Sequence, residues 1–291
     1  MEMCRIPTGG GRTLPFVKMQ GCGNDYIYID CFEETVEDPE TLARRLSDRH
    51  FGIGGDGVVL ICPSGVADAR MRMFNLDGSE GLMCGNAIRC VGKYLHDVRG
   101  VDKTEVTVET RSGIKRLRLI LKDGLVDEAE VDMGKARLTP GAIPVTLPGE
   151  AVVDCPVSVA GGDYRITCVS MGNPHCVVFC DQPDSLRLEE VGPRFEHDPL
   201  FPERVNTEFV QVVDAHTLRM RVWERGSGET LACGTGACAS VVAAVLCGHC
   251  PRDEEVQVLL RGGTLTVRYR VDGSVLMRGP AEFAFEGRVV L

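Results

Sequence analysis

The feature that most constrains this chain is a cysteine-containing segment that occurs twice. Residues 80–90 read EGLMCGNAIRC and residues 229–239 read ETLACGTGACA, so that Cys84 and Cys233 lie 149 positions apart in a chain of 291 residues. The same offset pairs Phe74 with Trp223, Glu80 with Glu229, Leu82 with Leu231, Gly85 with Gly234 and Asn24 with Asn173. One constant offset over separated places indicates an internal duplication.

The patterns of apolar residues predict mostly strands and few helices. Alternating runs predict strands at 26–30, 114–122, 157–160, 217–223 and 264–270. Helical patterns occur at 39–50, after Cys84 and after Cys233. We therefore expect an α/β (α+β) fold of two pseudo-symmetric domains, each a mostly antiparallel or mixed sheet curled around one central helix.

The two central helices differ in their apolar faces. After Cys84, an apolar stripe runs along one helical face, and Gly100 is suited to end the helix; the stripe consists of Ile88, Val91, Leu95 and Val98. After Cys233, the run ACASVVAAVL is apolar on every side and ends before Gly248. The second helix is therefore expected to be buried all round.

Two equivalent halves would bring two helix N-termini, each with a cysteine, face to face across a cleft. A helix N-terminus binds carboxylates and lowers the pKa of a thiol beside it, so we expect thiolate to form near neutral pH. One thiolate could remove a proton from a carbon next to the bound carboxylate while the opposite thiol delivers a proton to the other face. Spacing alone is equally compatible with two structural cysteines at buried helix starts.

Composition excludes several classes of protein. The formal net charge of −10 argues against non-specific binding to nucleic acid or to an anionic membrane. The sequence has neither a long apolar run nor a recognisable signal peptide, and its 14 cysteines are expected to be reduced and mostly buried. We expect a cytoplasmic protein.

Six motifs together resemble those of the diaminopimelate epimerase family. They are KMQGCGNDY (18–26), FGIGGDG (51–57), FNLDGSEGLMCGNAIRC (74–90), GNPHCV (172–177), RVNTEF (204–209) and WERGSGETLACGTGACA (223–239). Their order and spacing follow the family over nearly the whole chain. The resemblance implies a cofactor-independent isomerase that interconverts LL- and meso-diaminopimelate, in the synthesis of lysine and peptidoglycan precursors, with no metal site.

The resemblance also assigns roles to residues. It implies that Cys84 and Cys233 are the acid and base, and that His175 and Glu224 tune the pKa of the thiols. The residues that match substrate-binding positions are Asn24, Asn75, Gly85, Asn86, Asn173, Asn206, Glu224, Arg225, Gly234 and Thr235. In this family the last strand returns to the first domain, so we place the domains at 1–131, joined by 279–291, and at 132–278.

Two positions depart from the family pattern. Members often have glycine where this chain has Ala87, which would introduce strain if that residue needs a positive φ but would favour a helix otherwise. Some members have glutamine where this chain has Gly57, so Gly57 is left out of the predicted site.

Other interpretations carry less weight. The segment CGHC at 247–250 resembles a redox motif, but Cys247 is predicted to end a helix rather than begin one, and a zinc site there lacks an obvious fourth ligand. The segment at 52–57 follows a helix and precedes a strand, the reverse of a dinucleotide site. The main alternative is a proline racemase-like enzyme, followed by a binding-only protein of this fold. A homodimer is left open.

Overall fold

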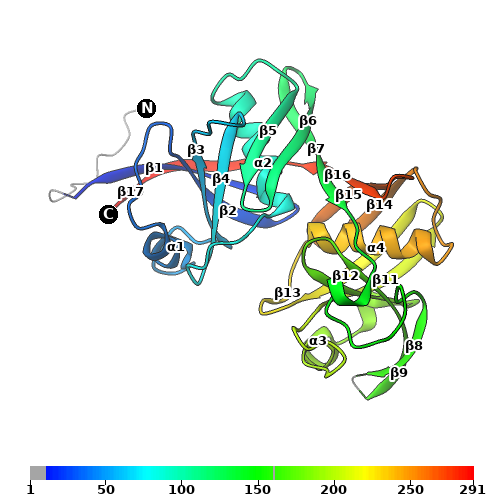
Figure 1. The fold of residues 1–291 in the computed structure, drawn as a ribbon. Coiled ribbons are helices and arrows are strands. Elements are labelled where there is room, and N and C mark those ends of the chain that lie inside the picture. The colour runs from blue at the N-terminus through cyan, green and yellow to red at the C-terminus, as the bar shows by residue number, and fades with distance from the viewer. Residues whose placement is uncertain (1–10, 160) are drawn as a thin grey trace.

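The computed structural model describes residues 11–159 and 161–291 as two halves of similar construction (Figure 1). The first half contains β1 (Thr13–Gly21), β2 (Asn24–Asp30), α1 (Pro39–Ser47), β3 (Gly57–Cys62), β4 (Ala69–Asn75), α2 (Gly85–Asp97), β5 (Glu105–Thr110), β6 (Gly113–Lys122) and β7 (Leu125–Lys135). The second half contains the 3₁₀ turn η1 (Pro140–Ala142), β8 (Cys155–Val159), β9 (Gly162–Ser170), β10 (Pro174–Phe179), the 3₁₀ turn η2 (Pro183–Ser185), α3 (Leu188–Glu196), β11 (Asn206–Asp214), β12 (Thr217–Glu224), β13 (Gly228–Glu229), α4 (Gly234–Leu246), β14 (Glu255–Leu260), β15 (Gly263–Tyr269) and β16 (Ser274–Pro280). The last strand is β17 (Glu282–Val290).

The offset of 149 residues recurs in the limits of the elements. Both ends of α4 lie 149 positions after those of α2, and the same holds for α3 after α1 and for β9 after β1. The mixed pairing repeats as well, because β2 and β3 are parallel neighbours, as are β10 and β11. The predicted fold class and the duplication are therefore confirmed.

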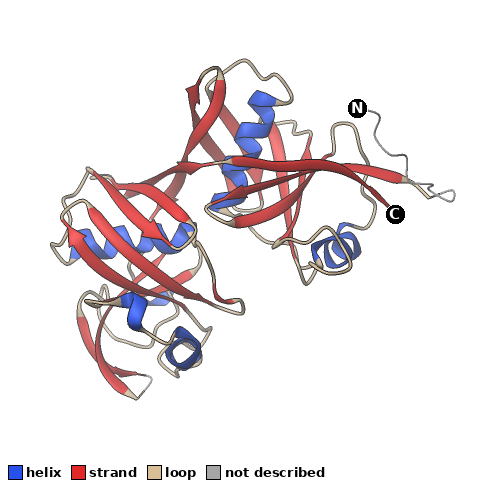
Figure 2. Ribbon diagram, turned by 180° about the vertical axis from the view of Figure 1, so that it is seen from behind, coloured by secondary structure: helices blue, strands red, loops and turns tan. Residues whose placement is uncertain are grey.

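Each half wraps its strands around one long helix, α2 or α4 (Figure 2). On α2 the predicted stripe is buried at Ile88, Val91 and Leu95, whereas Val98 caps the helix and is 52% exposed. Gly100 follows with a φ of +68°, which suits a helix end. Helix α4 buries nearly all of its residues, as its uniformly apolar sequence predicts.

The helical patterns identified in the sequence do not include α3. This helix contains Pro193, which lacks the backbone N–H that a helix interior uses. Its stability comes from packing, since Leu188 and Phe195 are fully buried. The indole of Trp223 packs against its backbone at Gly192 and donates a hydrogen bond of 2.8 Å to Glu196.

The last strand pairs with the first. Strand β17 runs antiparallel to β1 from Val290 opposite Thr13 to Glu282 opposite Gln20, so it lies in the first half. The two halves are joined by antiparallel pairing of β7 with β16. The predicted limit at residues 131 and 132 falls inside β7, and the exact division into domains stays a prediction. No helix among residues 11–159 and 161–291 is long and apolar enough to cross a membrane.

Candidate active site

Cys84 and Cys233 are the N-cap residues of the two central helices. Each has an extended backbone, and each sulfur accepts a hydrogen bond of 3.4 Å from a backbone N–H in the first turn, that of Ala87 in α2 and that of Gly236 in α4. The thiols therefore occupy the place of the oxygen in a usual N-cap. The remaining N–H groups of both first turns are suited to bind an anion.

The first turns of the two helices lie close together. A Cβ built at Gly234 would be 3.5 Å from the side-chain oxygen of Asn86 and 3.1 Å from the sulfur of Met277. A Cβ at Gly85 would lie 2.8 Å from the terminal methyl of the same methionine. Glycine at both positions lets the helix N-termini approach each other, as the duplication predicts.

The Cys84 thiol is bonded to the start of β2. It donates to the amide oxygen of Asn24 at 3.3 Å, and the amide nitrogen of Asn24 donates to Asp56 at 2.6 Å. The carboxylate of Asp56 therefore orients the Asn24 amide so that its oxygen faces the sulfur.

A longer chain of polar groups reaches Cys233. Its sulfur is 3.5 Å from the hydroxyl of Thr235, which accepts a hydrogen bond of 3.2 Å from Asn173. The oxygen of Asn173 is 3.0 Å from Nε2 of His175, and Nδ1 of His175 is 2.7 Å from Glu208. His175 and Glu208 are fully buried, so this chain runs into the core of the second half.

Glu224 acts on both thiols. Its carboxylate accepts a hydrogen bond of 2.5 Å from Thr230, and burial raises its pKa, partly offset by hydrogen bonds from Thr230 and Cys233. The negative charge of Glu224 in turn raises the pKa of both Cys84 and Cys233. One carboxylate thus affects the proton affinity of both sulfurs.

The expectation of a lowered thiol pKa is wrong. Burial raises the pKa of Cys84, and the backbone N–H groups of the first turn only partly compensate. Burial and the charges of Glu224 and Glu208 raise the pKa of Cys233 well above its ordinary value. The helix N-terminus acts in the predicted direction, but loss of water has the larger effect.

The remaining predicted residues are less directly connected to the thiols. Asn206 is buried, donates to the carbonyl of Pro174 at 2.9 Å and accepts from the backbone N–H of Arg225 at 2.8 Å. The exposed Arg225 guanidinium donates to the carbonyl of Glu203 at 2.9 Å. Asn75 donates to Ser79 at 3.0 Å, and no hydrogen bond found in the described part of the chain joins it to another predicted site residue.

Three polar residues that the sequence did not single out support this cluster: Asp56, Arg89 and Glu208. Asp56 and Glu208 contact Asn24 and His175 as described above. Arg89 is fully buried and donates to the side chain of Asn86 at 2.9 Å and to the carbonyl of Gly85 at 3.1 Å. All three lie inside the motifs quoted above, and their place in these motifs is the sequence feature that points to them.

The structure accounts for both departures from the family pattern. Ala87 is the third residue of α2 and is absent from the positive-φ positions, so alanine suits it better than glycine. At Gly57 a Cβ would lie 2.1 Å from the carbonyl oxygen of Phe74 and 2.9 Å from the ring of Tyr26. A side chain at position 57 would require the neighbouring strand to move.

In the CGHC segment the pKa of both cysteines is raised, whereas a redox motif needs a cysteine with a lowered pKa. Cys247 caps the C-terminus of α4, and burial raises its pKa. Burial also raises the pKa of Cys250 to about 11. In the ranges 11–159 and 161–291, no three His, Cys, Asp or Glu side chains are grouped to hold a metal ion.

The fold defines a class of two-domain proteins in which each half curls a mixed sheet around one central helix. Solved structures of the same fold include a probable proline racemase from Agrobacterium radiobacter (TM-score 0.71, 16% identity, covering 96% of this chain and 93% of that one). Another is a PhzF-family phenazine biosynthesis protein from Bacillus anthracis (TM-score 0.68, 18% identity, covering 96% and 100%). At these identities the likeness shows the fold alone.

Sequence comparison assigns the chain within that class. The family model "Diaminopimelate epimerase" matches residues 16–139 and 167–284. Diaminopimelate epimerase of Acetivibrio thermocellus is 55% identical over 95% of this chain and 98% of its own length, and that of Desulfovibrio desulfuricans is 55% identical over 94% and 97%. The chain belongs to the diaminopimelate epimerase family, whose members are isomerases that need no pyridoxal phosphate.

Proposed function

We propose that this chain interconverts LL- and meso-2,6-diaminopimelate by proton transfer between two cysteine thiols and the α-carbon, in the synthesis of lysine and peptidoglycan precursors. The observation that carries the proposal is the pair of N-cap cysteines on two repeated helices whose first turns meet. The relatives that share about half of its residues are named diaminopimelate epimerase. Proton transfer by two groups on opposite faces of one carbon inverts its configuration.

The α-carboxylate would bind between the helix N-termini. The backbone N–H groups of Gly85–Asn86 and Gly234–Thr235 are the proposed donors, and the partial positive charges of both helices favour an anion there. The same groups would stabilise the negative charge that develops on the carboxylate when the α-proton leaves.

Glu224 is the proposed acceptor for the proton that must leave a thiol first. Its negative charge acts on both thiols, and because burial raises its pKa it accepts a proton more readily than an exposed carboxylate does. The ammonium group of an arriving substrate adds positive charge beside the sulfur and so favours thiolate. His175 and Asn173 would hold the Thr235 end of the site in place.

The far end of the substrate would be recognised at the edge of the cluster. Asn75, Asn173, Asn206 and Arg225 are the proposed contacts, with Asn24 and Asn86 closer to the reacting carbon. Arg225 is the cation of this set, and its planar fork suits a carboxylate.

The decisive experiment follows the α-proton. Purified protein is incubated with LL-diaminopimelate in D₂O, and loss of the α-proton signal is measured by NMR together with formation of the meso isomer. In Cys84→Ala and in Cys233→Ala the α-proton signal should persist and no meso isomer should form. The circular dichroism spectrum of both variants should match that of the wild type. If Cys84→Ala retained more than a tenth of the activity, the two-thiol mechanism would be wrong.

A proline racemase-like activity is supported only by the shared fold, and a binding-only role would leave the two N-cap thiols without a use. Cofactor independence, a cytoplasmic location and a homodimer stay predictions. If no cofactor is needed, activity should survive exhaustive dialysis against a chelator. A requirement for added zinc would contradict cofactor independence. Sedimentation analysis measures the oligomeric state.

A further inference from the structure

The two cysteine helices are entered through turns of the same construction. Between β4 and α2 the chain folds back so that Glu80 pairs with Phe74 through the backbone. Between β12 and α4 it folds back so that Glu229 pairs with Trp223. Both members of the second pair lie 149 positions after those of the first.

In each turn the glutamate carboxylate forms a bidentate ion pair with an arginine of the preceding strand. Nε and Nη2 of Arg72 donate to the two carboxylate oxygens of Glu80 at 2.8 and 3.1 Å. Nε and Nη2 of Arg221 donate to those of Glu229 at 2.8 and 3.0 Å. The arginines are also 149 positions apart, and two parallel hydrogen bonds fix the orientation of both side chains.

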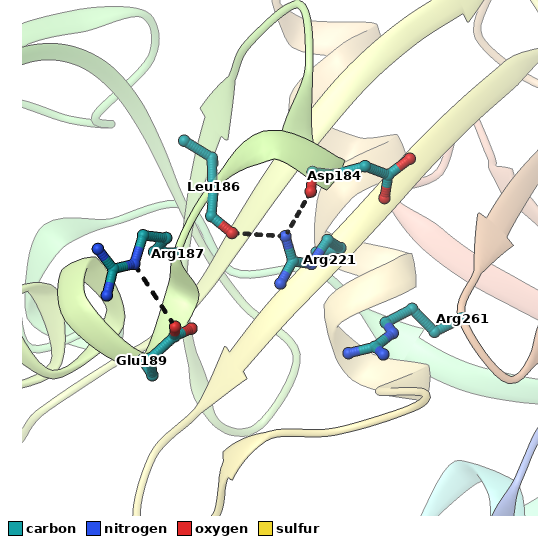
Figure 3. Close-up of a pocket in the computed structure, with 6 residues that line it drawn as sticks. All are labelled: Asp184, Leu186, Arg187, Glu189, Arg221 and Arg261. Atoms are coloured by element: carbon teal, nitrogen blue, oxygen red, sulfur yellow. Dashed lines mark hydrogen bonds and ion pairs between the residues drawn. The ribbon is translucent and has the colours of Figure 1, made fainter.

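Further contacts connect each pair to the rest of its half. Arg111 donates to the carbonyl of Glu80 at 2.8 Å, and Arg261 lies 3.0 Å from the carboxylate of Glu229. Arg221 also donates to the carbonyls of Pro183 and Leu186 at 2.8 and 2.7 Å, which ties the turn to η2; its bond to Leu186 is drawn in Figure 3. Neither turn can therefore shift without breaking several charge-assisted bonds.

Both glutamates are held in the charged form. Hydrogen bonds from Arg72 lower the pKa of Glu80. Burial alone would raise the pKa of Glu229, but the bonds from Arg221 and Arg261 outweigh it and the pKa falls below its usual value. The two ion pairs thus persist at neutral pH.

We propose that Arg72–Glu80 and Arg221–Glu229 are matched positioning clamps, each of which holds the turn that aims one of the two reactive thiols. Only three residues separate Glu80 from Cys84 and Glu229 from Cys233. The side chains of Arg72 and Glu80 are 32% and 21% exposed, and those of Arg221 and Glu229 are 11% and 19% exposed, so both pairs are shielded enough from water to keep a fixed geometry. The same two-bond geometry occurs before both thiols. We attribute it to the need to position each thiol, because a catalytic group must lie within about 0.5 Å of its productive position. The inference rests on the proposed function.

The test uses Glu80→Gln and Glu229→Gln, which keep the side-chain shape and remove the charge. Glu130→Gln is the control, because Glu130 forms an ion pair of 3.1 Å with the more exposed Arg118 on strands β6 and β7, through one carboxylate oxygen only. We expect kcat to fall at least tenfold in both test variants, with KM within threefold of wild type and the control unchanged. Arg72→Lys and Arg221→Lys, which keep the charge but lose the two-bond contact, should also lower kcat at least tenfold.

A second readout needs no substrate. The rate of iodoacetamide alkylation at each cysteine is measured by peptide mass spectrometry. Glu80→Gln should change the rate at Cys84 and leave Cys233 unchanged, and Glu229→Gln should do the reverse. A kcat within twofold of wild type, an equal loss in the control, or a change at both thiols in each variant would overturn the proposal. An inactive wild type would refute the proposed function instead, while the alkylation rates would still test the clamps.

Discussion

At the scale of single residues, the two N-cap cysteines have the same backbone conformation but different electrostatic surroundings. Cys84 faces the amide of Asn24, whereas the charges of Glu224 and Glu208 both act on Cys233. The repeat therefore gives the two thiols the same backbone geometry, whereas the side chains around them give the thiols different proton affinities. Such a difference suits a pair in which one group gives up a proton while the other takes one.

This difference predicts how the thiols titrate in the ligand-free protein. The pKa of Cys84 is raised and that of Cys233 is raised well above the ordinary thiol value, so thiolate forms only at higher pH. Alkylation by iodoacetamide requires thiolate, and its rate should therefore rise at a higher pH for Cys84 than for a free cysteine peptide, and at a still higher pH for Cys233. Peptide mass spectrometry after timed alkylation between pH 6 and 11 measures both midpoints. A midpoint below that of the peptide for either residue would contradict the role assigned to burial.

Arg225→Lys tests recognition of the remote end of the substrate. Lysine cannot form the two-pronged contact, and poorer alignment of the α-carbon should lower kcat as well as raise KM. We expect kcat/KM to fall at least tenfold, equivalent to about 1.4 kcal/mol. Arg268→Lys is the control, since that arginine pairs with Glu255 on the outer strands. Lysine and proline should be nearly inert as substrates; efficient racemisation of proline with Arg225→Lys near wild type would favour the alternative activity.

The sequence predicts the members of the site better than its electrostatics. Cysteine followed by glycine at a helix start locates both thiols, and the repeat relates Asn24 to Asn173. The raised thiol pKa depends on how completely the surrounding side chains exclude water, which no local pattern encodes. For the same reason no local sequence pattern predicts that the charged side chain of Arg89 is fully buried.

At the scale of elements, the repeat predicts more than hydrophobic periodicity does. Periodicity identifies α1, α2 and α4, but α3 contains Pro193 and shows no clear helical signal. The offset of 149 applied to α1 at Pro39–Ser47 gives the limits of α3 without further information. Tertiary packing against Trp223 outweighs the unfavourable local propensity.

The start of α2 provides a test of local propensity. Ala87 lies in the first turn with helical geometry, so glycine there would add conformational freedom to the unfolded chain. Ala87→Gly should lower the free energy of unfolding by about 0.5–1 kcal/mol and leave kcat/KM within twofold of wild type. Urea denaturation followed by circular dichroism measures the first quantity. An increase in stability would show that this position prefers glycine.

At the scale of the whole molecule, the two halves contact each other through loops close to Cys233. The loop between β1 and β2 lies against the second half, because a Cβ at Gly262 would be 1.9 Å from the carbonyl oxygen of Cys22 and a Cβ at Gly23 would be 3.0 Å from Leu231. Leu231 is two residues before Cys233, and its carbonyl accepts the N–H of Gly262 at 2.9 Å. The duplication predicts two facing halves, but this contact is between loops that do not correspond in the repeat, so it could not be predicted from the sequence.

Gly262→Ala should therefore impair catalysis more than folding. The added methyl group meets backbone atoms of Cys22, which cannot rotate away as a side chain could, so the halves must separate slightly. A misplacement of about 1 Å between groups that must flank one carbon costs on the order of 100-fold in rate. We expect kcat to fall at least tenfold while the melting temperature, measured by calorimetry, drops by only about 4 °C or less, the shift that about 1 kcal/mol causes in a chain of this size. Gly65→Ala is the control, because a Cβ there has no atom within 4 Å and the backbone needs no positive φ. Activity of Gly262→Ala within twofold of the control would show that the loop contact does not set the separation of the thiols.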